Sequence, residues 1–153
     1  MRTESPGTLE RAYRDHGARI QRAVVLFTGS RQIAEDAVAD AFALALDRPD
    51  AVRDPVAWVW KVAFRLAARE LERVKRTGGE VPELAVPENP SLVDLSRALR
   101  RIAPKQRAAV VLHHYAGYST REVARILGST QGAVMVHLSE GRRRLRRLLE
   151  ERG

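Results

Sequence analysis

The sequence predicts an all-α protein of two small helical domains joined by a short linker. Aromatic residues make up only 5% of the 153 residues, and the alternation of β-branched residues that is typical of strands hardly occurs. Apolar residues instead recur three and four positions apart, between capping residues and glycines. Residues 78–91 hold three Pro, two Gly and three Glu, a composition typical of linkers. We therefore expect domains at residues 1–78 and 92–153, with residues 79–91 between them.

Three helices are expected in the first domain. The first begins after Thr8 and ends at the Thr-Gly pair before Ser30, and its predicted core positions are Leu9, Tyr13, Ile20, Val24 and Phe27. Ser30 can cap the second helix. Asp54 followed by Pro55 is a start signal for the third, which ends before Gly78. Packing these helices on one another is the simplest way to bury their apolar faces.

The second domain is divided more sharply. We expect one helix after Ser91 and another from Pro104 to Gly117. Ser119 and Glu122 form an S-x-x-E capping box that opens a short helix. This helix ends at the glycine in position 128, and the next begins near residue 130, which together make a helix-turn-helix. The buried positions predicted for the last helix are Val134, Leu138, Leu145 and Leu149.

Charge and composition limit the possible functions. The net charge is +8, and residues 92–153 hold 13 Lys and Arg against five Asp and Glu, which favours a nucleic-acid partner for this part. The chain has no Cys, which excludes disulfides and thiolate metal sites. No apolar run is long enough to span a bilayer, and the first residues lack a signal-peptide core, so we expect a cytoplasmic protein without membrane insertion.

Groups that resemble catalytic or metal sites have simpler explanations. Glu35, Asp36 and Asp40 lie within one and a half helical turns, yet no histidine or phosphate-binding loop accompanies them. An interaction surface for basic residues is therefore favoured. His113 and His114 are adjacent, so their side chains diverge by about 100° on a helix. We expect no catalytic residues, no metal and no cofactor.

Both halves of the chain resemble one family. The segment "IAPKQRAAVVLHHYAGYSTREVARILGSTQGAVMVHLSEGRRRLRRL" resembles region four of the bacterial sigma factors. The segments "AEDAVADAFALAL" and "DPVAWVWKVAFRLAAREL" resemble region two of the same family. Two such regions joined by a short linker are the plan of the extracytoplasmic-function (ECF) group.

The resemblance implies a subunit that binds core RNA polymerase, recruits it to promoter DNA and helps to open the duplex, with an anti-sigma factor as a conceivable further partner. It implies a polymerase-binding face at Glu35, Asp36, Asp40 and Phe42. The start-proximal promoter element would meet Lys61, Arg65 and Arg69, with Trp58 and Phe64 near enough to stack on unpaired bases. The upstream element would meet Thr130, Gln131, Met135, Val136, Ser139, Arg142, Arg143 and Arg146, where early side chains read bases and later arginines reach phosphates.

Two alternatives stay open at this stage. Met135 and Val136 stand where the family usually has polar or basic residues, His137 replaces an arginine, and Arg65 replaces an asparagine. These departures suit a sigma-like interaction protein with weakened promoter reading. The other alternative is a stand-alone helix-turn-helix regulator whose first domain serves dimerisation or an effector.

Overall fold

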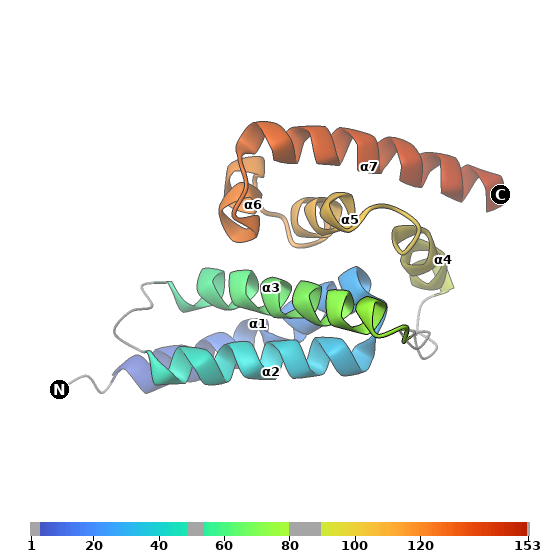
Figure 1. Ribbon diagram of the computed structural model, residues 1–153. Coiled ribbons are helices and arrows are strands. Elements are labelled where there is room, and N and C mark those ends of the chain that lie inside the picture. The colour runs from blue at the N-terminus through green and yellow to red at the C-terminus, as the bar shows by residue number, and fades with distance from the viewer. Residues whose placement is uncertain (1–3, 49–53, 80–89, 153) are drawn as a thin grey trace.

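The computed structural model describes residues 4–48, 54–79 and 90–152. Throughout these residues the secondary structure is helical, without any strand, which confirms the predicted fold class. Figure 1 shows the first helices of the chain as a lower layer and the later helices above them, with one long helix at the top. The elements are α1 (Glu4–Thr28), α2 (Arg31–Asp47), α3 (Pro55–Arg76), α4 (Pro90–Leu99), α5 (Pro104–Val110), a π-helical turn η1 (Val111–Tyr115), α6 (Thr120–Leu127) and α7 (Gln131–Arg152).

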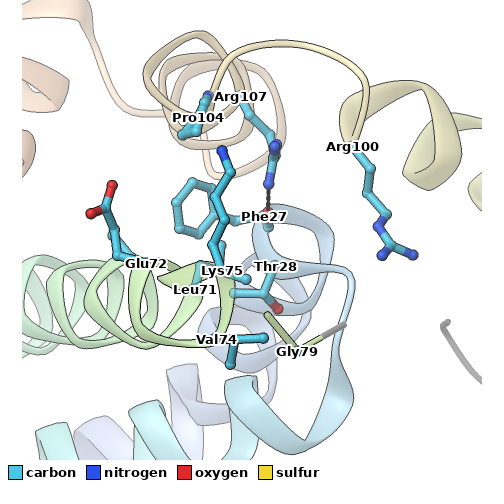
Figure 2. Close-up of a pocket in the computed structure, with 11 residues that line it drawn as sticks. Phe27, Thr28, Leu71, Glu72, Val74, Lys75, Gly79, Arg100, Pro104 and Arg107 are labelled. Carbon is cyan, nitrogen blue, oxygen red and sulfur yellow. Dashed lines mark hydrogen bonds between the residues drawn. The ribbon is translucent and has the colours of Figure 1, made fainter. Parts of the chain in front are cut away.

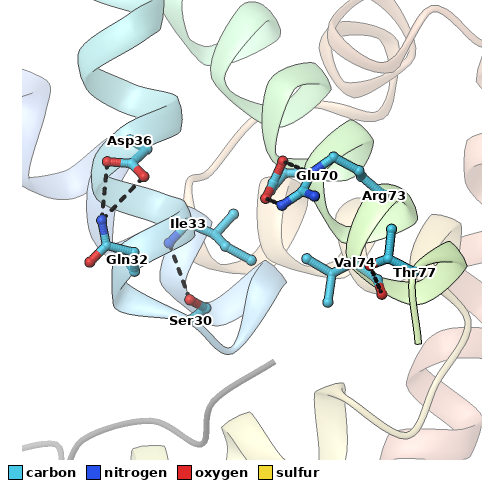
Figure 3. Close-up of polar contacts among 8 residues, drawn as sticks. All are labelled: Ser30, Gln32, Ile33, Asp36, Glu70, Arg73, Val74 and Thr77. Atoms are coloured by element: carbon cyan, nitrogen blue, oxygen red, sulfur yellow. Dashed lines mark hydrogen bonds and ion pairs between the residues drawn. The ribbon is translucent and has the colours of Figure 1, made fainter. Parts of the chain in front are cut away.

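The first three helices pack on one another as predicted. Ser30 Oγ accepts a hydrogen bond from Ile33 N at 3.1 Å and caps α2 (Figure 3). The Asp54 carboxylate likewise accepts from Ala57 N at 3.3 Å and caps α3. α1 begins at Glu4, four residues before the predicted Thr8. The core between these helices includes Ile20, Val24, Phe27, Val38 and Val59.

One predicted core position of α1 is wrong. Tyr13 is exposed and meets Phe42 of α2 edge to face, with ring centroids 5.0 Å apart. The phenolic hydroxyl suits such an edge position, where one end of the ring is buried and the other is wet.

The other four helices form the upper layer, in which α7 packs across α4, α5 and α6. The helix predicted from Pro104 to Gly117 is broken, because α5 gives way to the π-helical turn η1 at Val111. At the end of this turn Ala116 N donates to Val111 O at 3.0 Å, the i→i+5 bond of a π-helix. α4 begins at Pro90, one residue before the predicted cap Ser91.

The two layers pack against each other, an arrangement that the sequence left open. α3 contacts α6, while α1 contacts η1, α4 and α5, and the buried apolar residues of both layers form one continuous cluster. At this seam the Trp60 and Tyr118 rings meet edge to face at 5.4 Å. Arg19 Nη2 also donates to Tyr115 O at 2.9 Å, and Arg22 Nε donates to the Tyr115 hydroxyl at 3.1 Å. Aromatic rings and arginines therefore join the layers.

Candidate nucleic-acid interface

The helix-turn-helix is held by local hydrogen bonds that its sequence encodes. Ser119 N donates to Glu122 Oε1 at 2.9 Å and Glu122 N donates to Ser119 Oγ at 3.1 Å, so the capping box at the start of α6 is complete. These hydrogen bonds to Ser119 hold the pKa of Glu122 below its usual value. Gly128 ends α6 with φ of +67°, a conformation that favours glycine. Thr130 Oγ1 then accepts from Ala133 N at 3.1 Å at the start of α7.

The inner side of α7 follows a spacing of four and three residues. Val134, Leu138, Leu145 and Leu148 are buried, and the gap in this series is filled by Gly141. A Cβ atom at Gly141 would lie 3.1 Å from Val110 Cγ2 and 3.3 Å from Gln106 Cβ. α7 therefore approaches α5 closely at a position that has no side chain.

One predicted member of this buried stripe is wrong. Leu149 is 38% exposed, and the neighbouring Leu148 is buried in its place. The stripe continues the three- and four-residue spacing through Gly141 and thus reaches position 148. The pattern of apolar side chains alone does not reveal that this buried series reaches Leu148, because its central residue, Gly141, has no side chain.

The outer side of α7 carries the residues predicted to read DNA. Met135 and Val136 are 55% and 53% exposed, a large apolar surface on one turn of the helix. Gln131 Nε2 donates to Thr120 Oγ1 at 2.8 Å, which ties the first residue of α7 to the first residue of α6. All eight residues predicted for the upstream element are exposed on one helix or immediately before it: Thr130, Gln131, Met135, Val136, Ser139, Arg142, Arg143 and Arg146.

Arg142 already has a protein partner. Its Nη1 donates a hydrogen bond to His114 Nε2 at 3.3 Å. His114 can accept this bond only when Nε2 carries no proton. Burial is the main cause that lowers the pKa of His114, and the neighbouring His113 and Arg142 lower it further by electrostatic repulsion. His113 in turn donates from Nδ1 to Tyr118 O at 2.7 Å. Through these hydrogen bonds the two histidines stabilise the turn after α5, which is the structural role expected for them.

The residues predicted for the start-proximal element separate into two groups. Arg65 and Arg69 are exposed on α3 and, with Trp58 and Leu44, line a cavity of about 250 Å³. Phe64 is 1% exposed, so the structure removes it from the candidate surface.

Phe64 lies in the core for a packing reason. It packs against Phe27 and Trp60, with ring centroids 5.2 Å and 6.1 Å away. A side chain on the inner face of α3 cannot also stack on a base outside. Trp58 and Lys61 are half-buried, so only part of each side chain reaches solvent.

Arg65 extends toward the second layer. Its Nη2 lies 2.9 Å from where a Cβ atom of Gly128 would stand, so the guanidinium rests on the turn of the helix-turn-helix. Farther along α3, Arg73 forms an ion pair with Glu70 at 2.6 Å (Figure 3). This ion pair lowers the pKa of Glu70.

The predicted polymerase-binding residues lie on α2. Glu35, Asp36 and Asp40 are exposed, and the Asp36 carboxylate accepts from Gln32 Nε2 at 3.2 and 3.3 Å (Figure 3). Phe42 is buried, and its ring faces Tyr13, so it is a core residue and not part of an exposed face. Within the described ranges, no group of three His, Asp or Glu could hold a metal ion, and no helix is both long and apolar enough to cross a membrane.

Sequence reasoning missed Arg107. This residue of α5 is 9% exposed, and its Nη1 donates to Phe27 O at 2.8 Å across the seam. Its Nη2 donates to Ile102 O at 3.2 Å. The signal was present in the sequence, because Arg107 stands three and four residues before Val110 and Val111 and so shares their buried face.

Comparison with known proteins agrees with these features. Residues 92–145 match the family described as Sigma-70, region 4. The chain is 30% identical over 158 residues to the ECF RNA polymerase sigma factor BldN of Streptomyces coelicolor, covering 92% of this chain and 60% of BldN. It is 28% identical over 156 residues to the ECF RNA polymerase sigma factor SigL of Mycobacterium tuberculosis, covering 92% of this chain and 88% of SigL.

A solved structure has the same fold. The sigma factor RpoE of Bartonella quintana, in complex with the anti-sigma factor NepR, superposes with a TM-score of 0.75. The two chains are 22% identical, and the superposition covers 86% of this chain and 89% of RpoE. The predicted resemblance is confirmed: residues 92–145 match Sigma-70, region 4, and most of the chain is similar to ECF RNA polymerase sigma factors.

Proposed function

We propose that this protein binds core RNA polymerase and directs it to promoters, acting in the cytoplasm as an initiation factor that catalyses no reaction itself. The similarity of most of the chain to ECF RNA polymerase sigma factors carries this proposal. Residues 1–78 and 92–153 serve as separate domains connected by residues 79–91. RpoE, whose fold this chain shares, was solved with an anti-sigma factor, and a partner of that kind is also proposed here.

Recognition of the upstream promoter element is assigned to the exposed side of α7. Its first turns present Gln131, Ser139 and Arg143 as polar readers of base edges, while Met135 and Val136 offer apolar contact, for instance to a thymine methyl group. Arg142, Arg143 and Arg146 also extend toward the phosphates. The support is geometric: one exposed helical face carries all of these residues, and the opposite face is buried against α5 and α6.

The start-proximal element is assigned to α3, through Lys61, Arg65 and Arg69 with Trp58 beside them. Trp58, Arg65 and Arg69 line one cavity together with Arg48, and a basic groove with an aromatic side chain suits single-stranded DNA. The acidic face of α2, formed by Glu35, Asp36 and Asp40, is assigned to basic residues of the polymerase. Phe42 and Phe64 are left out of both surfaces because they are buried.

The decisive experiment is transcription in vitro from a library of genomic fragments, with and without core polymerase. The protein should co-elute with core polymerase at low salt and enrich one class of promoter. Arg143→Gln should reduce this enrichment, whereas Arg101→Gln, which removes an equal charge from an exposed residue outside α7, should not. Failure to bind core polymerase at low salt would overturn the proposal.

One observation favours a second candidate function. Because Met135 and Val136 are both exposed and apolar, the protein would bind polymerase while reading promoters weakly. Met135→Lys combined with His137→Arg should then strengthen promoter binding, and an unchanged affinity would count against this candidate. A stand-alone regulator would instead bind specific DNA without polymerase, and recovery of specific fragments from the same library by the protein alone would identify it.

A further inference from the structure

A cavity of about 290 Å³ lies at the seam between the two layers. Phe27 and Thr28 at the end of α1 contribute to its wall, as does Lys75 near the end of α3. Arg100 and Arg107 contribute from the upper layer, and Figure 2 shows Lys75 rising from α3 toward α5 below Arg107. The volume is at the lower end of the range for small-molecule sites.

The charges that line this cavity are unbalanced. Lys75, Arg100 and Arg107 carry positive charge, and Glu72 is the one acidic residue in the lining. Among the residues that the structure describes, neither Lys75 nor Arg107 has a carboxylate within ion-pair distance. Lys75 and Arg107 therefore bring two positive charges to this cavity without a paired carboxylate, which suits an anionic ligand.

Arg107 is the most constrained of these cations. It is nine-tenths buried, and its two recorded hydrogen bonds reach only the neutral carbonyls of Phe27 and Ile102. Its Nε is buried and has no hydrogen-bond partner. Burial, together with the nearby Arg100, lowers the pKa of Arg107. A buried cation without a counter-ion is costly, so a bound anion would be favoured here.

The partial negative charge at the C-terminal end of α1 explains the positions of only some of these cations. The last turn of α1 has no basic residue of its own, and Arg107 supplies a cation at its final carbonyls. Arg100 reaches the same end, because its side chain lies against Gly29, which follows α1. Neither contact uses Lys75 or satisfies Arg107 Nε. Half a negative charge at a helix end also offsets only part of the combined positive charge of Lys75 and Arg107.

We propose that this cavity binds a small phosphorylated anion, with Lys75 pairing directly with the phosphate and Arg107 supplying the buried positive field. A phosphate monoester carries about 1.5 to 2 negative charges at neutral pH, and an inorganic diphosphate carries more. The phosphate group can belong to an inorganic diphosphate or to a nucleotide, because in both the phosphate oxygens are the atoms that Lys75 would bind.

Such a ligand would join the two layers. Its site combines residues of α1 and α3 with residues of α5, so it binds the packed arrangement and stabilises it by mass action. In that arrangement Arg65 lies on Gly128 and is less available to DNA. This consequence rests on the proposed function, whereas the binding site itself does not.

Isothermal titration calorimetry on the full chain tests the site, with inorganic diphosphate and adenosine 5′-monophosphate as separate probes. The matched variants are Lys75→Gln and Arg76→Gln, which remove equal charge from adjacent exposed residues of α3, of which only Lys75 lines the cavity. Wild type and Arg76→Gln should bind one equivalent with the same affinity. Lys75→Gln should bind about tenfold more weakly, the loss expected for one charge-assisted contact.

The two probes identify the source of the phosphate. Tighter binding of the nucleotide would assign the rest of the cavity to its sugar and base, whereas tighter binding of diphosphate would assign an inorganic ligand. The melting temperature should rise with the tighter probe in wild type and rise less in Lys75→Gln. The absence of saturable binding of both probes up to about 10 mM, which corresponds to free energies too weak for a built site, would overturn the proposal. Equal affinities of Lys75→Gln and Arg76→Gln would overturn it as well.

Discussion

Replacing Gly141 by leucine should separate α7 from α5. A Cβ atom at this position would already lie 3.1 Å from Val110 Cγ2 and 3.5 Å from Gln106 O, and leucine adds three more carbon atoms. Overpacking of this kind costs about 1–3 kcal/mol. Leucine also has the better helix propensity, which returns about 0.8 kcal/mol in a helix interior. We therefore expect a net loss of roughly 1 kcal/mol, or a melting temperature lower by about 2–4 °C for a protein of this size.

Gly132→Leu is the matched control, because it makes the same chemical change on the same helix. No atom lies within 4 Å of a Cβ placed at Gly132, so its stability should be unchanged or slightly higher. Thermal and urea unfolding followed by circular dichroism would measure both variants. If Gly141→Leu is as stable as Gly132→Leu, the close approach of α7 to α5 is wrong. Adding Val110→Ala should recover part of the loss, since the two positions are in contact.

Three further predictions concern the cap, a tyrosine and the DNA. Ser119→Ala should lower stability by about 1 kcal/mol, as loss of an N-cap does, and Ser129→Ala is an exposed control for the same unfolding measurement. Burial, followed by Asp54 and Glu122, raises the pKa of Tyr118 to about 12. The stabilisation that neutral Tyr118 contributes should therefore be fully present below the pKa of tyrosine in the unfolded chain, near 10. It should be lost as the pH rises through 12. In an absorbance titration at alkaline pH, Tyr118→Phe should lack this late tyrosinate step, and its persistence would refute the assignment. Arg143→Gln should reduce the salt slope of promoter binding by about 0.9 units if this residue neutralises one phosphate, and an unchanged slope would exclude that contact.

The helix boundaries and the family could be predicted because their signals are local. Ser30, Asp54 and Ser119 each accept the backbone hydrogen bond that their positions predict, and Gly128 has the left-handed conformation that ends α6. A cap depends on residues within one turn, so the sequence contains all the information that it needs. The π-helical turn at Val111 has no comparable local signal.

Burial was harder to predict, because it depends on partners far away in the sequence. Phe42 and Phe64 were expected on functional surfaces, yet each packs against aromatic rings of α1 or its own helix. Tyr13 shows the opposite error, since it fits the periodicity of α1 but remains exposed. Periodicity identifies the apolar face of a helix, whereas only the neighbouring helices decide how far along that face the core extends.

The two faces of α7 have different roles, because one packs in the core and the other is exposed. The inner residues Val134, Leu138 and Leu148, with Gly141 between them, set how closely the helix lies on the others. Helix position therefore depends on small and aliphatic residues, and the arginines contribute to it little. They are exposed, and of the three proposed for phosphate contact Arg142 has a hydrogen bond to a histidine.

The seam between the layers sets a condition on promoter binding. In the packed arrangement Arg65 lies against Gly128, although the proposed function requires Arg65 on the start-proximal element. The turn of the helix-turn-helix covers one side of this guanidinium, so a DNA phosphate can reach only its remaining N–H groups. Full engagement of Arg65 by promoter DNA therefore requires this side chain to move or the layers to separate, and separation also costs the contacts of Arg107 and Tyr115 across the seam. Any ligand that stabilises these contacts will oppose promoter binding, and polymerase that binds the separated layers will favour it.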